Sequence, residues 1–311
     1  MKMVGCNKTF VTEFIFLGFS NQPRVQLVLF VVFLACYLFT VFGNVTIISV
    51  VSTYPRLHTP MYFFLINLSF LDIYYVSTNV PQMLMNLVTR RKTILFWGCA
   101  IQMYFSLAFG MTECFLLGVM AYDRYVAICQ PLLYTAIMNW KLCAQLAAFC
   151  WCSSLMSSMI INIFTLQLPF CGPNILNHYF CEVPAVLSLA STDTYLAEMV
   201  VFVFSIIIVF IPFLFIIVSY TYIFLAVLRI QTAQGRVKAF STCASHLTVV
   251  TIFYGTAIFM YMRPRSKSSR DGDKVIALFY TIIMPMLNPL IYSLRNKDVK
   301  DALKRPLVLI R

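Results

Sequence analysis

The sequence contains little charge. Its 311 residues include 23 Lys or Arg and only 11 Asp or Glu, so charged residues make up 11% of the chain, against about 25% in soluble domains. A water-soluble enzyme or binding domain would need a more highly charged surface. The net charge of +12 is spread over loops and termini, which argues against nucleic acid as a partner.

Histidine is scarce as well. The three histidines, His58, His178 and His246, lie far apart, and none stands at metal-ligand spacing from a cysteine. The first twenty residues lack the continuous apolar core and the small-residue cleavage site of a secretory signal peptide. The first apolar segment is therefore expected to act as its own insertion signal.

Apolar residues make up 61% of the chain and run in long segments. Residues 25–55 contain no charged side chain, and neither do residues 199–228. At ~1.5 Å per helical residue, both exceed the ~30 Å hydrocarbon core of a bilayer. The prediction is an all-α bundle of seven transmembrane helices. They are expected near 25–51, 58–81, 97–128, 140–163, 197–228, 238–262 and 273–294.

The Lys and Arg count, which usually orients such a bundle, is nearly balanced. With the N-terminus outside, 11 of the 23 fall outside. Two other features favour that orientation: a glycosylation sequon at Asn7, and Cys99 with Cys181, which both then face the oxidising side, where a disulfide persists. We expect 1–24 to be an extracellular N-terminus, 25–294 the bundle and 295–311 a cytoplasmic tail. Within the tail, 298–304 is expected to form an amphipathic surface helix.

A charge pair stands at the inner end of the third segment, in the string MAYDRYVAIC (120–129). Arg124 follows Cys99 by 25 residues, or ~37 Å of helix, which places it at the cytoplasmic interface. On its own, Asp123-Arg124 is also consistent with an interfacial arginine paired for solubility.

The surrounding motifs extend over nearly the whole chain. They are GN (43–44), LHTPMYFFL (57–65), LSFLD (68–72), KAFSTCASHL (238–247) and PMLNPLIYSLRN (285–296). Together with MAYDRYVAIC, in this order, they resemble the signature of odorant receptors of the tetrapod-type class, a branch of the rhodopsin-like G-protein-coupled receptors.

This resemblance implies a plasma-membrane receptor that binds an odorant and activates a stimulatory, olfactory-type heterotrimeric G protein to raise cyclic AMP. On activation, the inner end of the sixth segment is expected to move outward and to release Arg124 from Asp123. The residues expected to take part are Asp123, Arg124, Tyr125, Tyr220, His246, Asn288, Pro289 and Tyr292.

The resemblance also places a ligand pocket in the outer halves of the third, fifth, sixth and seventh segments. In the third segment, one face carries residues spaced i, i+3, i+4, i+7 and i+8, a stripe that in another fold would indicate helix packing. The expected pocket residues are Met103, Ser106, Leu107, Gly110, Met111, Phe204, Ser205, Ile208, Tyr254, Ala257, Ile258, Tyr261, Leu278 and Thr281.

The composition of this pocket predicts the chemistry of the ligand. Amine receptors of the wider family carry an aspartate in the upper third segment, where this chain has Ser106. The pocket therefore suits a small, neutral, mostly apolar molecule with one hydrogen-bonding group. An acidic ligand held by Arg263 and Arg265 is the alternative, although Pro264 and the basic loop beyond favour a solvated rim.

Two carboxylates, Asp72 and Glu113, lie at similar depth in adjacent segments. Held close in a low dielectric, they cannot both stay ionised unless a cation joins them or one binds a proton. The resemblance favours a sodium ion at Asp72, and the alternative is a protonated cluster with Asn44 and Asn288. No other cofactor is expected.

The cysteines depart from the family pattern at one position. The resemblance implies a disulfide between Cys99 and Cys181. A third loop cysteine, usual in the family, is replaced here by Ser191. Cys171 is then either free or paired with Cys6.

Other classes of membrane protein fit less well. A transporter would show internal repeats or charges along several segments, and an enzyme would show a grouping of catalytic side chains; the sequence shows neither. A receptor of the same type used outside the nose for a non-odour metabolite remains open.

Overall fold

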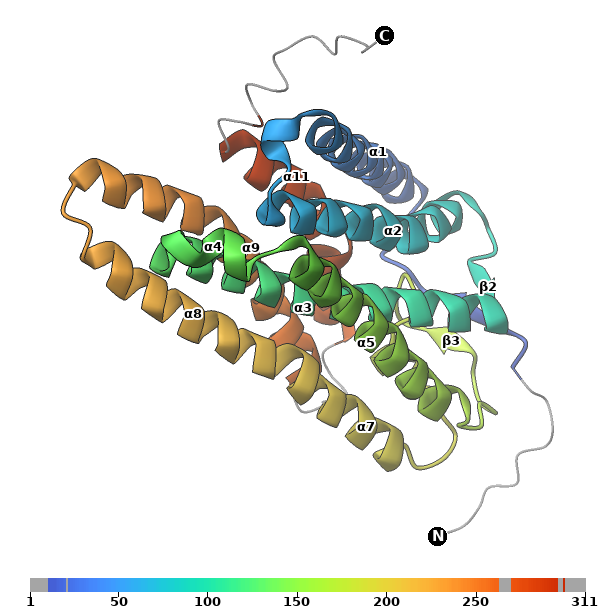
Figure 1. Cartoon of the computed structure of the whole chain (residues 1–311). Coiled ribbons are helices and arrows are strands. Elements are labelled where there is room, and N and C mark those ends of the chain that lie inside the picture. The colour runs from blue at the N-terminus through green and yellow to red at the C-terminus, as the bar shows by residue number, and fades with distance from the viewer. Residues whose placement is uncertain (1–10, 21, 263–269, 296–298, 300–311) are drawn as a thin grey trace.

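The seven predicted spans are confirmed in the computed structural model, which describes residues 11–20, 22–262, 270–295 and 299. The first four spans are single helices: α1 (Pro23–Thr53), α2 (Pro60–Val88), α3 (Phe96–Cys129) and α5 (Trp140–Leu166). The fifth consists of α7 (Tyr195–Ser205), η3 (Ile206–Phe210) and α8 (Ile211–Leu228). The sixth is α9 (Ala233–Met262), and the seventh consists of α10 (Arg270–Leu278), η4 (Phe279–Ile283) and α11 (Met284–Arg295). Figure 1 shows them packed as a bundle.

Local sequence sets where these helices begin. Pro23 and Pro60 occupy the first helical turns of α1 and α2, where the missing N–H costs nothing and the fixed φ suits a helix. Asn139 caps α5 by accepting a hydrogen bond from the backbone N–H of Leu142 at 2.9 Å. Short helical turns fill the connections: η1 (Pro55–Leu57), η2 (Pro131–Leu133), α4 (Tyr134–Ile137) and α6 (Val183–Leu187).

The fifth and seventh spans each contain one wide π-helical turn, η3 and η4. A proline follows each turn within two residues of its end, Pro212 after η3 and Pro285 after η4. Because proline has no N–H, the carbonyl four residues earlier loses its helical partner, and the backbone widens. Both turns face the cavity described below.

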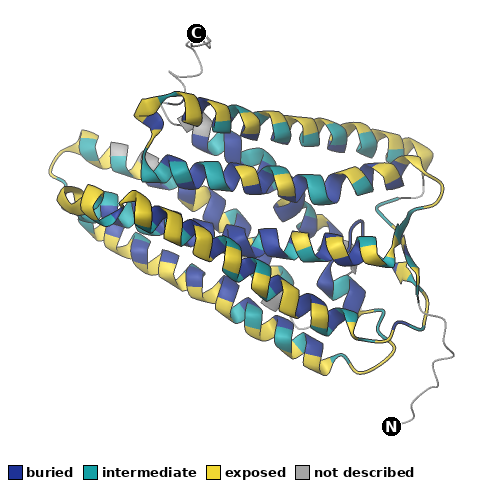
Figure 2. Cartoon of the chain, turned by 45° about the vertical axis from the view of Figure 1, so that its right-hand side comes forward, coloured by how far each residue is buried: buried dark blue, intermediate teal, exposed yellow. Residues whose placement is uncertain are grey.

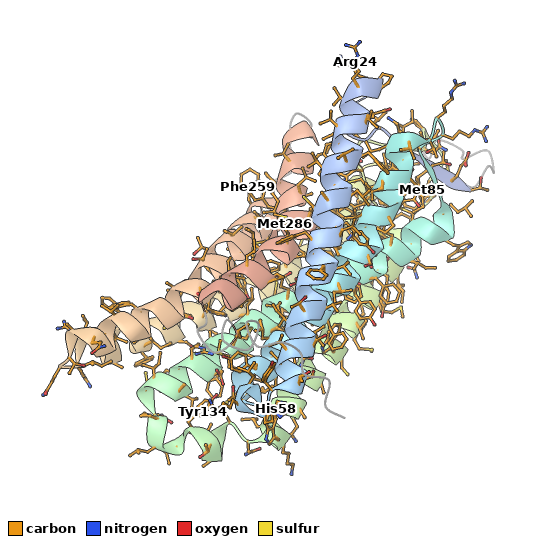
Figure 3. All side chains as sticks on the ribbon, turned by 90° about the horizontal axis from the view of Figure 1, so that it is seen from above. Arg24, His58, Met85, Tyr134, Phe259 and Met286 are labelled. Atoms are coloured by element: carbon orange, nitrogen blue, oxygen red, sulfur yellow. A yellow bond between two sulfur atoms is a disulfide. The ribbon has the colours of Figure 1, made fainter. Side chains whose placement is uncertain are left out.

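A three-stranded sheet covers one end of the bundle, called here the sheet end. β1 (Glu13–Phe16) lies between β2 (Thr93–Leu95), to which it is antiparallel, and β3 (Ile175–Leu176), to which it is parallel. Phe14 and Phe16 of β1 are buried. These pairings of the segment before the first span were not predicted from the sequence. Figure 3 shows Arg24 near this end of α1, and His58 and Tyr134 at the opposite end.

Figure 2 shows exposed residues on the outer faces of the helices and buried residues towards the interior, and many of the exposed residues are large and apolar. This inverted surface is what a bilayer requires of a spanning bundle. The first and seventh spans approach closely, since a Cβ added at Gly43 would lie 3.2 Å from Cβ of Pro289. The motif glycine at position 43 is therefore explained by packing.

Candidate functional site

A small apolar cavity of about 60 Å³ lies between the third, fifth, sixth and seventh spans. α3 contributes one wall, the wide turn η3 a second, and Tyr280 of η4 a third. The lining residues are Tyr75, Ser106, Leu107, Gly110, Met111, Cys114, Phe204, Ser205, Ile208, Val209, Phe253, Ala257 and Tyr280. Ligand pockets usually measure ~300–1,000 Å³, so a ligand of odorant size must push these walls apart.

Most of the sequence-predicted pocket residues lie at this cavity. Those that line it are Ser106, Leu107, Gly110, Met111, Phe204, Ser205, Ile208 and Ala257. Met103 lines a smaller adjoining cavity, which shares Ser106, Leu107 and Tyr280 with the first. The side chain of Tyr261 lies outside the described residues.

Four predicted residues do not line either cavity: Tyr254, Ile258, Leu278 and Thr281. Tyr254 is fully buried, donates a hydrogen bond to the carbonyl of Cys114 at 2.7 Å and stacks on Phe213. Thr281 is hydrogen-bonded to Tyr179 at 2.8 Å. Tyr254 thus joins α9 to α3 and α8, and Thr281 joins the seventh span to the loop after α5.

Two lining residues that were not predicted from the sequence are explained by the rotation of their helices about the helix axis. Phe253 and Tyr280 line the cavity, each one residue before a predicted position, Tyr254 and Thr281. In the seventh span, the wide turn η4 rotates the inward face relative to a regular helix. Tyr75 was missed because α2 was not expected to reach the pocket.

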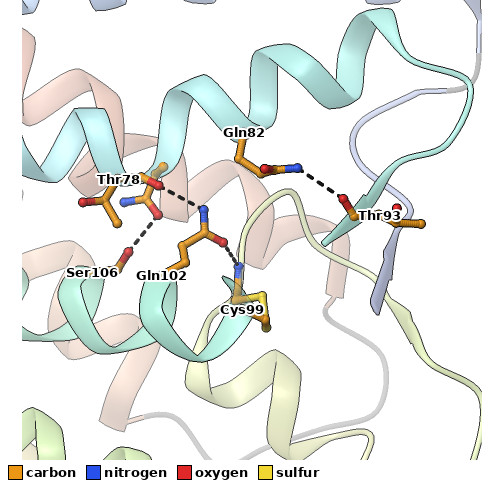
Figure 4. Close-up of a disulfide and its surroundings, with 8 residues drawn as sticks. Thr78, Gln82, Thr93, Cys99, Gln102 and Ser106 are labelled. Carbon is orange, nitrogen blue, oxygen red and sulfur yellow. Dashed lines mark hydrogen bonds between the residues drawn. A yellow bond between two sulfur atoms is a disulfide. The ribbon is translucent and has the colours of Figure 1, made fainter. Parts of the chain in front are cut away.

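The loop between α5 and α7 covers this site and is called the roof below. A disulfide joins the roof to α3. Cys99 and Cys181 are bonded, as predicted. Gln102 supports the same point, because its side-chain oxygen accepts a hydrogen bond from the N–H of Cys181 at 2.9 Å and its amide donates to the carbonyl of Thr78 at 3.1 Å (Figure 4). The loop is thereby fixed to both α2 and α3.

The roof contributes a carboxylate, that of Glu182, which was not predicted from the sequence. Glu182 lines the adjoining cavity and is 5% exposed. It accepts a hydrogen bond from the Tyr280 hydroxyl at 2.5 Å, and its second oxygen lies 3.4 Å from Nε2 of His178. The expectation of a pocket without a carboxylate nearby is therefore corrected: sequence spacing along helices says nothing about a residue that a loop folds inward.

His178 is buried in this roof, and burial together with the nearby charge of Lys274 lowers its pKa to about 3. The folded chain thus holds a neutral imidazole at physiological pH. Since an unfolded histidine binds a proton near pH 6.5, the folded state is at full stability above that value and loses stability as the pH falls from about 6.5 towards 3.

Replacing His178 with glutamine is expected to remove this pH dependence. His178 alone is expected to account for about 1.4 kcal/mol of lost stability at pH 5.5, one unit below its unfolded pKa. Thermal unfolding of purified receptor at pH 7.5 and 5.5 measures it. His58→Gln is the matched control, because His58 is exposed at the opposite end; it should keep the full pH dependence. Equal pH dependence in His178→Gln and the parent would contradict the assignment.

Ser191 stands at the position of the missing third cysteine and still joins the two parts of the loop. Its hydroxyl accepts a hydrogen bond from the N–H of Cys171 at 2.9 Å. Cys171 is itself disulfide-bonded, so the alternative of a free thiol is wrong. The predicted partner Cys6 lies outside the described residues, as do the Asn7 sequon and, apart from the buried Val299, the predicted tail helix.

Asp72 and Glu113 are both fully buried in the middle of the bundle. The amide of Asn288 donates to both oxygens of Asp72, at 3.1 and 3.0 Å. Several nearby oxygens have no hydrogen-bond partner among the described residues: both carboxylate oxygens of Glu113 and the side-chain oxygens of Asn44 and Asn288. Unpaired buried acceptors of this kind are what a small cation or a proton would satisfy. The donor set therefore fits a hard cation, which prefers oxygen ligands.

At the end opposite the sheet, Arg124 is loosely held. Its nearest guanidinium nitrogen lies 3.7 Å from Asp123 and makes no hydrogen bond to a described residue. Asp123 is held more firmly by the loop, since the Tyr134 hydroxyl donates to it at 2.7 Å. Burial and the neighbouring Asp123 raise the pKa of Tyr134 well above its ordinary value, so this donor stays protonated.

Three of the other predicted activation residues, Tyr220, His246 and Tyr292, lie near Arg124. Tyr220 and His246 are hydrogen-bonded at 2.8 Å and join α8 to α9. The hydroxyl of Tyr292 is buried without a hydrogen-bond partner in the described part of the chain. Tyr125 packs against Tyr122 and Tyr222, and Pro289 meets the first span at Gly43.

Seven membrane-spanning helices, a roof pinned to the third helix by a disulfide, and an Asp-Arg-Tyr cluster at the opposite end together define a rhodopsin-like G-protein-coupled receptor. A family model described as olfactory receptor matches residues 33–309. The chain is 54% identical over 299 residues to human olfactory receptor 2G3, which covers 96% of this chain and 97% of that protein. It is 52% identical over 303 residues to mouse olfactory receptor 2B6, with 97% of each chain covered. The chain belongs to the olfactory receptor family.

Members of this family are multi-pass plasma-membrane receptors and not enzymes. The transporter and enzyme alternatives are thereby excluded.

Proposed function

We propose that this receptor binds a small, neutral, mostly apolar volatile in the cavity below the roof and activates a stimulatory, olfactory-type G protein that raises cyclic AMP. The observation that carries the ligand class is the lining of the main cavity, which is aliphatic and aromatic apart from Ser106, Ser205 and the Tyr75 and Tyr280 hydroxyls. Ser106 already donates to Asn79 at 2.8 Å. A ligand with one polar group can exchange with that bond, whereas an anionic ligand would lose its hydration close to the buried carboxylate of Glu182.

The proposal also states which end of the bundle faces the outside of the cell. The sheet end faces outward, because the Cys99–Cys181 disulfide there needs an oxidising compartment. The end with Arg124 then faces the cytoplasm.

Cavity size supports a mechanism for activation. A ligand larger than the present ~60 Å³ cavity binds more tightly to any conformation in which the fifth and sixth spans have moved apart. It therefore shifts the receptor towards that conformation by differential affinity. At the cytoplasmic end, the same movement separates Tyr220 from His246 and frees Arg124 to meet the G protein.

The proposal includes a sodium ion between Asp72 and Glu113, with Asn44 and Asn288 as further oxygen donors. The ion would neutralise the buried carboxylates and hold the second, third and seventh spans in the inactive arrangement. The remaining alternative is a shared proton, which would satisfy the same oxygens.

Sodium is expected to reduce agonist potency in the parent receptor by about fivefold or more, as a coupling free energy of ~1–3 kcal/mol gives. Glu113→Gln and Asp72→Asn should each abolish the effect. The measurement is a concentration–response curve in membranes with sodium or with choline as the cation. Equal potency in both salts for the parent receptor would favour the proton.

The function itself is tested by a cyclic-AMP assay in cells that express the receptor with the olfactory stimulatory G protein, across a chemically broad volatile panel. Neutral, mostly apolar compounds are expected to give responses, and carboxylic acids of the same size are not. Responses to carboxylic acids alone would contradict the neutral-ligand proposal and would favour binding at Arg263 and Arg265. The assay does not depend on tissue, so a metabolite used outside the nose would be found in the same way.

A further inference from the structure

A second and larger groove, of about 490 Å³, lies on the outer side of the bundle between α8 and α9. It is separate from the ligand cavity and extends towards the end at which the α8–α9 hairpin projects (Figure 1). The lining residues are Phe213, Ile216, Ile217, Tyr220, Thr221, Ile223, Phe224, Val227, Ala239, Phe240, Cys243, Leu247, Val250 and Thr251.

The groove has a buried floor and exposed walls. Ile223, Val227 and Cys243 form the floor and are 4% exposed or less, whereas Phe224 and Phe240 on the rim are 50% and 44% exposed. Along α8, the lining runs from Phe213 to Val227, or ~21 Å of helix. One leaflet contributes about half of the ~30 Å hydrocarbon core, so the groove is long enough for one acyl chain.

The groove offers no free hydroxyl to its occupant. Thr221 and Thr251 donate to the carbonyls of Ile217 and Leu247, each at 2.8 Å. The third hydroxyl, that of Tyr220, is hydrogen-bonded to His246. The hydroxyl protons of the two threonines are therefore already used, and an unbranched hydrocarbon chain needs no hydrogen-bond partner.

Uncompensated positive charge marks the mouth of the groove. Arg229 follows the last lining residue of α8 by two positions, and Arg236 precedes the first lining residue of α9 by three. Both are exposed, and neither forms an ion pair with a residue in the described part of the chain. From residue 199 to residue 270 the sequence contains no Asp or Glu at all. Cationic side chains at this membrane surface attract anionic lipid headgroups.

We propose that this groove is a binding site for an anionic phospholipid of the cytoplasmic leaflet. One acyl chain lies between α8 and α9, and the headgroup, by its net negative charge, is attracted to Arg229 and Arg236. The inference rests on the orientation given under the proposed function. It also gives the lipid a role: a chain seated between these helices favours the separated arrangement that activation requires.

Photo-crosslinking of the full receptor in lipid vesicles tests the site. The probes are phosphatidylserine and phosphatidylcholine that carry the same photoreactive acyl chain, each diluted into phosphatidylcholine vesicles and followed by peptide mass spectrometry. Phosphatidylserine is expected to label residues 213–227 and 239–251 at least severalfold more than phosphatidylcholine. High salt should reduce that excess, because screening weakens the headgroup contact. Equal labelling by the two lipids would overturn the proposal.

Paired variants localise the charge. Arg229→Gln with Arg236→Gln should remove the phosphatidylserine excess. Arg56→Gln with Lys141→Gln removes two exposed cations from the same end of the bundle and should leave it intact. The proposed site would be contradicted if both double variants lost the excess of phosphatidylserine labelling. It would also be contradicted if a photoreactive sterol labelled the groove more strongly than phosphatidylserine does. Because crosslinking needs no agonist, a failed odorant assay leaves this result interpretable, while crosslinks from lipid confined to the outer leaflet would refute the orientation itself.

Discussion

Replacement of Arg124 with alanine is expected to abolish the cyclic-AMP response to every agonist of this receptor. Arg124 is the only predicted activation residue with a permanent positive charge, and at 3.7 Å from Asp123 it is held loosely enough to be released. Its removal takes away the group that the G protein would meet in the opened cleft. Response amplitude at equal surface expression is the measurement.

Arg56→Ala is the matched control for this prediction. Arg56 is an exposed arginine at the same end of the bundle, and its loss should leave the response near that of the parent. A response that survived in Arg124→Ala would remove the role assigned to this residue, whatever the control showed.

Loss of the Cys99–Cys181 disulfide is expected to have the second large effect. The bond joins residues separated by 82 positions, and removing a native disulfide typically costs about 2–5 kcal/mol. Here it also frees the roof, since Gln102 alone would hold Cys181 to α3. Cys181→Ser should therefore reduce surface receptor and the thermal midpoint sharply.

The free cysteine Cys152 provides the control, because it is exposed on α5; Cys152→Ser should behave as the parent. The double variant Cys99→Ser with Cys181→Ser should be no worse than either single change, since both remove the same bond. A double variant clearly less stable than the singles would show that the cysteines also contribute separately.

Hydropathy and motifs were sufficient for the fold, because a bilayer demands long apolar helices with few alternatives. The motifs also indicated the family, and the resemblance to that family implied the disulfide between Cys99 and Cys181. Helical periodicity identified the correct face of α3, because that helix is regular. Its predicted residues Ser106, Leu107, Gly110 and Met111 all line the cavity.

The prediction failed at some positions of regular helices, such as Tyr254 on α9, and also where the backbone departs from a regular helix or leaves it altogether. In the seventh span, the wide turn η4 brings Tyr280 rather than Thr281 to the cavity. Glu182 reaches the site from a loop, and β1 pairs with two segments distant in sequence. Such placements depend on tertiary contacts, which a periodic pattern does not encode.

The central claim, that agonists activate the receptor from the cavity below the roof, is tested most directly by filling that cavity. A Cβ added at Gly110 would meet only the Tyr75 hydroxyl, at 3.7 Å, so valine fits the helix and its methyl groups occupy ligand space. Gly255→Val is the matched control, because that glycine is exposed on α9 with nothing within 4 Å of an added Cβ. At equal surface expression, Gly110→Val is expected to weaken agonist potency at least about tenfold, as a loss of ~1.4 kcal/mol gives, and Gly255→Val to leave it unchanged. Unchanged potency in Gly110→Val would contradict the account.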